Sequence, residues 1–387
     1  MALLRRRRPA RWVLPALVVG GVAAILLWKF VFGGLFGINL DTAVSGQTTL
    51  TLPAGFTANV FATGLDNPRF MAIGPDGTLF VAERGRNRIV ALPDRNGDGR
   101  ADEQITVASD LHAPSSLDFY QGTLIVGEED QVSAITLDAN QHQVARTVLV
   151  PQLPNNGLHT TKTVLVGPDG RLYVAMGSTC NVCQESDPRR AAVSVYPIAG
   201  GTGQVFSRGL RNAVGLAINP VSRAIWATTN GRDLWGDDRP PETVNVLQAG
   251  ADFGWPRCHA GTLVDPDFGG SLGCQGVTPP VATMPAHMAP LALLFYQGSR
   301  FPAGYRDSLY IAFHGSWNST RLVGYKVMRV PLAAGKVAGP AEDFATGWQV
   351  GNAGATGRPA GLAEGADGSL LVSDDKGGFI YRITASP

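Results

Sequence analysis

The sequence predicts an all-β chain folded as a six-bladed β-propeller. Six segments share one pattern, which is a turn around Asp-Gly or Gly, a hydrophobic strand, a short break and a second strand. Such a unit cannot bury its own apolar face, so the copies must pack against one another. Six of them over roughly 330 residues suit a six-bladed propeller, whose ligands bind at the central channel. The copies begin at Gly74, Tyr120, Gly167, Ser222, Arg306 and Gly365.

The propeller is expected to occupy residues 52–387. The chain has 387 residues, including 48 glycines and 26 prolines, a composition that suits short strands and tight turns. The longest interval between repeat units runs from about Trp226 to Leu309 and is rich in proline and glycine. We expect this interval to form long loops over one face of the propeller and not a separate domain.

The N-terminal segment has the pattern of a membrane anchor. Arg5 to Arg8 and Arg11 precede an apolar stretch over residues 12–38, in which Lys29 can snorkel toward the interface. The basic cluster predicts a cytoplasmic segment 1–11, a single transmembrane signal-anchor helix 12–38 and a linker 39–51. The propeller would then lie in the periplasm or outside the cell. A cleaved signal peptide is the alternative, but no small-x-small cleavage site stands out after the apolar stretch.

Charge and cysteine content agree with an exported propeller. The first 40 residues carry six of the 32 Lys and Arg residues and no acidic residue, so the remainder is mildly acidic and has no basic face for nucleic acid. All four cysteines lie in the remainder. Cys180 and Cys183 form a CxxC, which could be a redox pair or half a zinc site. A redox CxxC needs a helix N-terminus, whereas Cys180 follows a predicted strand, so two structural disulfides in an oxidising compartment are favoured.

Two histidines lie beside blade strands, where channel-facing loops are expected. They are His159, within NNGLHTTKT, and His314, within FHGSWN. The glycine-rich approach of the first would place its imidazole at the rim of the channel, with a pKa near neutrality that suits a general base. A purely structural histidine is the alternative.

Arg211 and Asn212 immediately precede a blade strand. A cationic fork beside an amide suits carboxylates and carbonyl oxygens. An arginine that only stabilises its loop by bonding backbone carbonyls is the alternative.

Two acidic loops have residue types that bind calcium. The first, at residues 228–247, carries several carboxylates beside Gly231, and hard oxygen ligands next to a glycine turn suit Ca²⁺, although solvated turns have the same composition. Its acidic residues are Asp233, Asp237, Asp238 and Glu242. The second, DRNGDGRADE from Asp94, resembles the start of an EF-hand, but Ile105 stands at the twelfth position, where a glutamate is required. We interpret the second loop as a hairpin turn.

Taken together, these segments resemble the glucose/sorbosone dehydrogenase family, six-bladed propellers that use pyrroloquinoline quinone (PQQ) and calcium. The resemblance covers nearly the whole chain after residue 52 and is greatest to the L-sorbosone dehydrogenase branch. It rests on GPDGRLYVAMGSTCNVCQESDPRRAAV, GLRNAVGLAINP, NGRDLWGDD, ADFGWPRCHAG and FHGSWN.

The resemblance implies a role for particular residues. His159 would be the general base that takes the proton of a sugar hydroxyl while hydride passes to the quinone, and Arg211 and Asn212 would contact the quinone oxygens. The backbone carbonyls of Gly231 and Arg232 would bind the calcium.

Two further positions would face the cofactor. Arg358, in GRPAGL, would hold a PQQ carboxylate, and Asn318 stands near the quinone where active family members carry a lysine. Other departures are Ala360 in place of a second arginine, Ser178 in place of an aspartate and the stretch APSS at residues 113–116 in place of a glutamine. The cations that could replace the lost charge are Lys162, Arg321 and Lys326.

The sequence therefore predicts a membrane-anchored, PQQ- and calcium-dependent dehydrogenase of an aldose or a sorbosone-like sugar aldehyde. The chain has no strand–GxGxxG–helix unit for a nicotinamide cofactor and no CxxCH haem site, so its electrons would leave through an external quinone or cytochrome. One alternative is a calcium-dependent lactonase that uses a metal-bound water. Another is a catalytically inactive propeller that binds a sugar or a protein, which the departures at Asn318 and Ala360 would favour.

Overall fold

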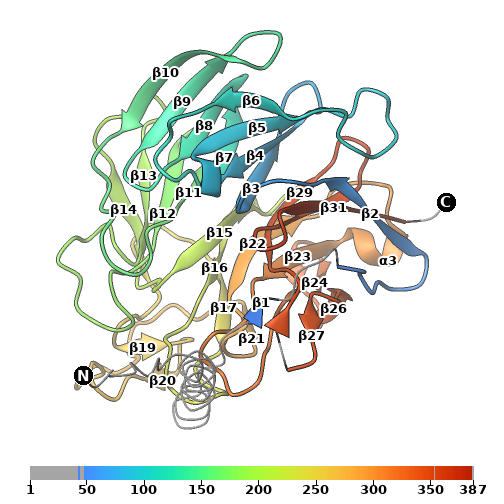
Figure 1. The fold of residues 1–387 in the computed structure, drawn as a ribbon. Coiled ribbons are helices and arrows are strands. Elements are labelled where there is room, and N and C mark those ends of the chain that lie inside the picture. The colour runs from blue at the N-terminus through green and yellow to red at the C-terminus, as the bar shows by residue number, and fades with distance from the viewer. Residues whose placement is uncertain (1–41, 44–47, 353, 386–387) are drawn as a thin grey trace, which may run out of the picture.

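The computed structural model describes residues 42–43, 48–352 and 354–385, whose main feature is a ring of six antiparallel sheets (Figure 1). This architecture confirms the predicted six-bladed propeller. The predicted cytoplasmic segment 1–11 and signal-anchor helix 12–38 lie outside the described residues, as does most of the linker 39–51. Within the described ranges, no helix has the length and apolar character needed to cross a membrane.

The strands of each blade follow one another from the channel outward. Blade 1 consists of β3 (Pro68–Ile73), β4 (Leu79–Glu83), β5 (Arg88–Leu92) and β6 (Ile105–Ala108). Blade 2 consists of β7 (Ser116–Tyr120), β8 (Thr123–Gly127), β9 (Val132–Leu137) and β10 (Gln143–Val150). Blade 3 consists of β11 (Lys162–Val166), β12 (Leu172–Met176), β13 (Ala192–Tyr196), β14 (Gln204–Arg208) and β18 (Ala251–Asp252).

The second half of the ring follows the same order. Blade 4 consists of β15 (Ala213–Ile218), β16 (Ile225–Thr229), β17 (Glu242–Val246) and β21 (Ala282–Met284). Blade 5 consists of β22 (Pro290–Phe295), β23 (Ser308–Phe313), β24 (Lys326–Ala333), β25 (Lys336–Val337) and β26 (Glu342–Ala345). Blade 6 consists of β29 (Pro359–Glu364), β30 (Leu370–Asp374), β31 (Phe379–Ala385) and β2 (Phe56–Ala62).

The remaining elements are short. They are β1 (Thr42–Ala43), β27 (Gln349–Val350), β28 (Gly354–Ala355), β19 (Cys258–His259), β20 (Leu263–Val264), the 3-10 helix η2 (Arg84–Arg86) and the helix α3 (Ala303–Arg306). The expectation that residues 226–309 form only loops is partly wrong, because this interval also supplies β17 and β21 of blade 4 and the inner strand of blade 5. Residues 247–281, between β17 and β21, form long loops that contain only the two-residue strands β18, β19 and β20.

The apolar strands are buried between neighbouring blades. The second strands β4, β12, β16, β23 and β30 are buried at every residue, since each lies in the middle of the packed sheets. One apolar cluster fills each of the six spaces between blades. The outer strand β10, by contrast, is exposed over most of its length. The blades therefore stabilise one another, as the repeated units predicted.

The ring is closed by pairing between the two ends of the described chain. Strand β2 pairs antiparallel with β31, from Phe56 opposite Ala385 to Ala62 opposite Ile380. Each inner strand contacts the next, and β29 of blade 6 contacts β3 of blade 1. An N-terminal segment thus completes the last blade.

The loops that precede the inner strands and the loops that follow the second strands lie at the same end of the channel. The register shows this, because the first residue of an inner strand pairs with the last residue of the second strand, as in Ala213 with Thr229 and Pro359 with Asp374. Buried carboxylates hold several of these loops. Glu128 accepts the backbone N–H of His112 at 2.7 Å, and corresponding bonds hold the mouth loops of blades 1, 5 and 6.

The cysteines and the loop at Asp94 fold as predicted. Disulfides join Cys180 to Cys183 and Cys258 to Cys274. The loop at Asp94 connects β5 to β6, and its carboxylate accepts the backbone N–H groups of Asp98 and Gly99. It is a side-chain-capped turn within a hairpin connection.

Phe56 is expected to be a main support of ring closure. Its ring packs edge-on against Phe301, Tyr305 and Phe344 of blade 5, with centroids 4.8–5.1 Å apart. Phe56→Ala should therefore lower the free energy of unfolding by about 3–5 kcal/mol, as for other buried aromatic deletions. Urea denaturation measures the change. Val144→Ala, at a residue 61% exposed on β10, is the control and should change stability by less than about 0.5 kcal/mol. Equal effects of the two substitutions would show that β2 does not close the ring.

Candidate active site

A cavity of about 320 Å³ lies at the mouth of the channel where these loops meet. Its volume is within the range for small-molecule pockets, about 300–1,000 Å³. The walls come from loops of blades 3 to 6. The lining residues are His159, Arg211, Asn212, Asn230, Gly231, Asp233, Glu242, His287, Ala289, Leu291, His314, Gly315, Trp317, Asn318 and Arg358. The structure therefore brings together every predicted site residue except Arg232.

His159 is held in one orientation by Ser178. Its Nδ1 lies 3.0 Å from the Ser178 carbonyl oxygen and 3.0 Å from the Ser178 Oγ. The Ser178 hydroxyl donates to the Cys180 carbonyl at 2.6 Å, so both atoms near Nδ1 act as acceptors. The proton of the neutral imidazole is thus on Nδ1, which leaves a lone pair on Nε2.

The imidazole of His159 is a neutral base. Burial, followed by the positive charges of Arg211 and Arg190, lowers the pKa of His159 to about 3. The expectation of a pKa near neutrality was wrong, because desolvation outweighs the hydrogen bond to Ser178. The lone pair on Nε2 is consequently present throughout the physiological pH range.

Gly177 allows two site residues to approach each other. A Cβ at this position would lie 2.5 Å from the Cβ of His159 and 2.4 Å from the Oδ1 of Asn212. Any larger residue would push one of them away. The side-chain amide of Asn212 makes no hydrogen bond within the described part of the chain, which leaves it available to a ligand in the cavity.

Arg211 is bound by the protein on every side. Its Nε and Nη2 donate to the carbonyl and side-chain oxygens of Asn181 at 3.0 and 3.1 Å, and its Nη1 donates to the Gly231 carbonyl. Its Nη2 also pairs with the Asp233 carboxylate. The loop-stabilising alternative therefore describes the contacts of Arg211, although the residue also lines the cavity.

Arg358 has a different environment. Its Nε donates to the His314 carbonyl at 2.9 Å and its Nη2 to the Gly315 carbonyl at 2.6 Å. Its guanidinium carbon lies 5.3 Å from the ring centroid of Tyr325. Among the described residues it forms no ion pair, although its positive charge is near enough to the buried Asp375 carboxylate to help lower the pKa of that group.

Asn318 does not replace the charge of a lysine. It is buried, and its Nδ2 donates to the Oδ1 of Asp233 at 3.1 Å. Asp233 thus lies between Asn318 and Arg211, and its negative charge neutralises the positive charge of Arg211.

Ala360 does not face the cavity. It is fully buried and packs with Val214, Leu291 and Phe70 in an apolar cluster that lies across the channel between the inner strands. Of its members, Leu291 also lines the cavity. Ala360 is therefore part of the packing of this chain and is not a gap at a cofactor site.

None of the three cations predicted to compensate reaches the cavity. Lys162 is fully buried and donates to the carbonyls of Glu129 and Thr160 at 2.7 and 2.6 Å. Arg321 is near Asp238, and Lys326 pairs with Asp343 at 2.6 Å. The hypothesis that they replace lost cofactor contacts is contradicted.

Of the two residues predicted to bind calcium, only Gly231 lines the cavity. The Arg232 side chain turns onto Asp265 and lies over the Trp235 ring, 5.2 Å from its centroid. The backbone carbonyl of Arg232 accepts no hydrogen bond from the described residues. A cation could therefore bind this carbonyl without displacing a protein donor, whereas the Gly231 carbonyl is shared with Arg211.

The acidic loop divides into two parts. Asp233 and Glu242 line the cavity, while Asp237 accepts hydrogen bonds from Thr320 and Asp238 is largely exposed. Glu242 accepts the backbone N–H groups of Gly231 and Ala289 at 2.7 and 3.2 Å. Burial raises the pKa of Glu242 to about 7.

A second imidazole, His314, faces the cavity and gains a partner that the sequence did not reveal. Its Nε2 lies 2.8 Å from the Asp375 carboxylate, which also pairs with Arg69. Burial lowers the pKa of His314 to about 4. The position of this histidine in FHGSWN, beside a blade strand, was the available signal. Its partner comes from another blade, 61 residues away along the chain.

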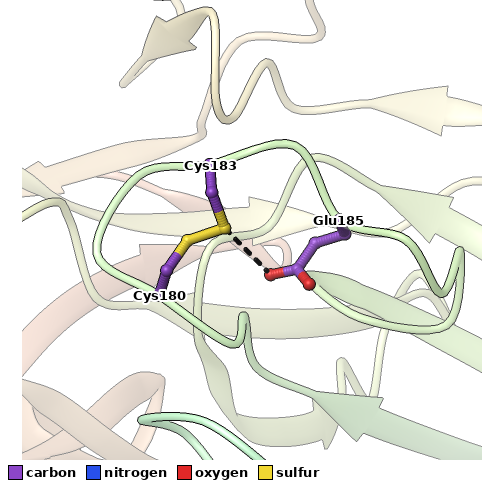
Figure 2. Close-up of side chains that lie close together, drawn as sticks. All are labelled: Cys180, Cys183 and Glu185. Carbon is purple, nitrogen blue, oxygen red and sulfur yellow. Dashed lines mark hydrogen bonds between the residues drawn. A yellow bond between two sulfur atoms is a disulfide. The ribbon is translucent and has the colours of Figure 1, made fainter.

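No group of three side chains that could hold a metal converges in the cavity within the described ranges. Among all described residues, the one group with such a geometry consists of Cys180, Cys183 and Glu185 (Figure 2). Its two sulfur atoms are joined in a disulfide, so they are not thiolate ligands. Side-chain carboxylates converging in the channel would favour the lactonase alternative, and no such group is found there among the described residues.

The sequence matches the TrAA12-like family over residues 50–266 and 270–386. The chain belongs to this family. A PQQ-dependent pyranose dehydrogenase of Coprinopsis cinerea is 27% identical over 404 residues, which cover 85% of this chain and 54% of that protein. The chain thus spans about half the length of this relative.

Solved structures show the same fold. The holo form of the PQQ domain of Coprinopsis cinerea pyranose dehydrogenase superposes with a TM-score of 0.76 at 25% identity, covering 88% of this chain and 98% of that one. A calcium structure of the Trichoderma reesei family AA12 enzyme superposes with a TM-score of 0.77 at 22% identity, covering 90% and 99%. Pyranose dehydrogenase activity with PQQ is thus found among relatives of this chain.

His159 should make folding sensitive to acid. Because the imidazole of the unfolded chain binds a proton below about pH 6.5 and the native one does not until about pH 3, stability falls as the pH decreases through this window. At pH 4.5 the loss due to His159 should be on the order of 2 kcal/mol. His159→Asn removes this contribution, so its unfolding free energy should fall less steeply between pH 6.5 and 4.5. His142→Asn, on the exposed β9–β10 loop, is the control. Parallel curves for wild type and His159→Asn would show that the native imidazole is not kept neutral.

Proposed function

We propose that this protein is a PQQ- and calcium-dependent dehydrogenase that oxidises an aldose or a sorbosone-like sugar aldehyde. The observation that carries the proposal is the arrangement of His159 and Arg358. An oriented, neutral imidazole and a guanidinium free of ion pairs line one small cavity. A base beside an anion-binding group is what the oxidation of an alcohol by a carboxylated quinone requires.

The residues of the cavity fit such a cofactor. Arg358 can bind a carboxylate, and the unbonded amide of Asn212 can donate to a quinone oxygen. Arg211 is neutralised by Asp233, so much of the remaining positive charge would come from a calcium at the carbonyls of Gly231 and Arg232. Asn318, which lines the same cavity, donates its amide N–H to the Asp233 carboxylate.

The protein groups have distinct tasks in the reaction. When bound, PQQ supplies a quinone that accepts hydride. His159 Nε2 accepts the proton of the sugar hydroxyl, and the Nδ1–H bond to Ser178 keeps this lone pair directed at the substrate. His314, held by Asp375, provides a second acceptor for a sugar hydroxyl. Leu291, packed with Val214 and Ala360, gives the cavity an apolar part of its wall.

The site of action proposed is the outer face of the cell membrane. The basic segment 1–11 and apolar segment 12–38 would anchor the chain, with the propeller in the periplasm or outside the cell. Two disulfides suit an oxidising compartment. An external quinone or cytochrome would then receive the electrons.

A propeller that binds its ligand without catalysis is the second candidate. The contacts of Arg211 favour it, because all its donors are bound by protein acceptors and its charge is paired with Asp233. Titration with PQQ separates the two candidates.

His159→Asn should abolish turnover and leave the cofactor bound. With the full chain, PQQ and calcium, sugar-dependent bleaching of the quinone absorbance should slow by about 10²–10⁴-fold, the usual effect of losing a general base. Binding of PQQ should be unaffected, since the histidine is uncharged and is not a carboxylate ligand. His142→Asn is the control. Bound quinone that no aldose or sugar aldehyde reduces in the wild type would favour the non-catalytic propeller.

Arg358→Gln should weaken PQQ binding by about 10- to 150-fold, because it removes one charge-assisted hydrogen bond. A spectroscopic titration with and without EDTA measures this. Arg321→Gln, at an exposed residue near Asp238, is the matched control and should bind like wild type. The proposal fails if neither the wild type nor Arg321→Gln binds PQQ at micromolar concentration with calcium present. It also fails if Arg358→Gln and Arg321→Gln bind PQQ equally well.

A further inference from the structure

We propose that Asn181, the first residue inside the Cys180–Cys183 disulfide loop, is the positioning residue for Arg211 and for the loop that carries Asp233. Neither the predicted roles of the site residues nor the proposed reaction uses Asn181, and it does not line the cavity. Its contacts nevertheless join two walls of the cavity that belong to different blades. The inference extends the proposed function, and its kinetic part rests on that function.

The side-chain hydrogen bonds of Asn181 converge on two charged residues of the site, Arg211 and Asp233. Its Oδ1 accepts from Arg211 Nη2 at 3.1 Å and from the backbone N–H of Asp233 at 2.7 Å. Its Nδ2 donates to the Asp233 carbonyl at 3.0 Å. One side-chain amide therefore fixes both partners of the Arg211–Asp233 ion pair.

The backbone of Asn181 adds a further support. Its carbonyl accepts from Arg211 Nε at 3.0 Å and from Trp255 Nε1 at 3.3 Å. Trp255 is buried in the long loop of blade 4. Asn181 thus connects the blade 3 loop to the Asp233 loop, which borders the cavity, and to the long loop of blade 4 that carries Trp255.

The disulfide holds this residue in place. A bond between Cys180 and Cys183 closes the backbone around Asn181 into a short loop (Figure 2). Glu185 holds the start of the same loop, because its carboxylate accepts the backbone N–H of Thr179 at 2.6 Å. This gives the CxxC motif a structural use that neither a redox pair nor a metal site would provide.

The same loop also orients the imidazole of the site. Ser178, which fixes His159 through its carbonyl and hydroxyl, donates to the Cys180 carbonyl at 2.6 Å. The base and the guanidinium are therefore both positioned by residues 178–181. A disturbance at Asn181 should change the orientation of Arg211 first, because Ser178 keeps its own contacts to His159.

The accessibility of the Arg211 guanidinium tests this directly, without cofactor or substrate. Phenylglyoxal modifies free guanidinium groups, and peptide mass spectrometry reports the labelling of each arginine. In the wild type, Arg211, whose side chain is 4% exposed, should react slowly, and Arg321, 68% exposed, serves as the internal standard. In Asn181→Ala the rate at Arg211 should rise about tenfold, since its side-chain acceptor is lost and the Asp233 loop is freed.

Two variants serve as controls. Asn181→Asp keeps an oxygen acceptor for Arg211 and for the Asp233 N–H, so the label at Arg211 should stay low. Asn219→Ala removes another buried asparagine, whose Nδ2 donates to the Gly335 carbonyl at 2.7 Å on the β15–β16 turn away from the cavity. It should lower the melting temperature without changing the labelling of Arg211. Unchanged labelling in Asn181→Ala, or equal increases in Asn181→Ala and Asn219→Ala, would overturn the inference.

The kinetic consequence provides a second readout. With PQQ, calcium and sugar, Asn181→Ala should reduce kcat about 10²-fold, with little change in KM, and Asn181→Asp should recover part of the loss. A wild-type protein that does not bind PQQ would contradict the proposed function, while the labelling result would still decide the role of Asn181. Wild-type kcat in Asn181→Ala, together with increased labelling, would show that the orientation of Arg211 does not matter to the reaction and would overturn that part of the inference.

Discussion

The pairing of β2 with β31 is the interaction on which the rest of the structure depends. A blade has no core of its own, and each apolar cluster is shared by two neighbours, so the ring is stable only when its first and last blades meet. Closure fixes the positions of all six inner strands at once. It also brings to one mouth loops that are as far apart in sequence as His159 and Arg358, which explains how residues from four blades line one cavity.

The electrostatics of that cavity follow from burial. Desolvation keeps His159 and His314 neutral, so both supply lone pairs without adding charge. Asp233 neutralises Arg211, which leaves Arg358 as a cation that lines the cavity without an ion pair among the described residues. An anionic cofactor would thus depend on Arg358 and on a bound metal ion, and a calcium at backbone carbonyls would supply charge that the missing lysine and second arginine do not.

The fold and the composition of the site could be predicted from the sequence because both depend on local patterns. Turn and strand signals repeat in each blade, and His159, Arg211 and Arg358 stand just before inner strands. The packing of Ala360 in an apolar cluster and the burial of Lys162 away from the cavity could not be predicted, because both depend on the direction of the side chain. The pairing of β29 with β30 shifts register between Pro359 and Leu362, and such a shift redirects side chains in a way that simple alternation does not predict. The pairing of His314 with Asp375 depends on contacts between blades, and the low pKa of His159 depends on burial, which the local sequence does not determine.

A crystal structure of the full chain grown with PQQ and calcium chloride tests the central claim most directly. We expect density for the quinone in the cavity between the loops of blades 3 and 6, with a carboxylate bonded to Arg358 and His159 Nε2 facing the space beside the ring. We also expect a calcium at the carbonyls of Gly231 and Arg232. A quinone bound elsewhere on the propeller, or a cavity that excludes it while Arg211 and Asp233 remain paired, would contradict the assignment of this cavity as the active site of a dehydrogenase.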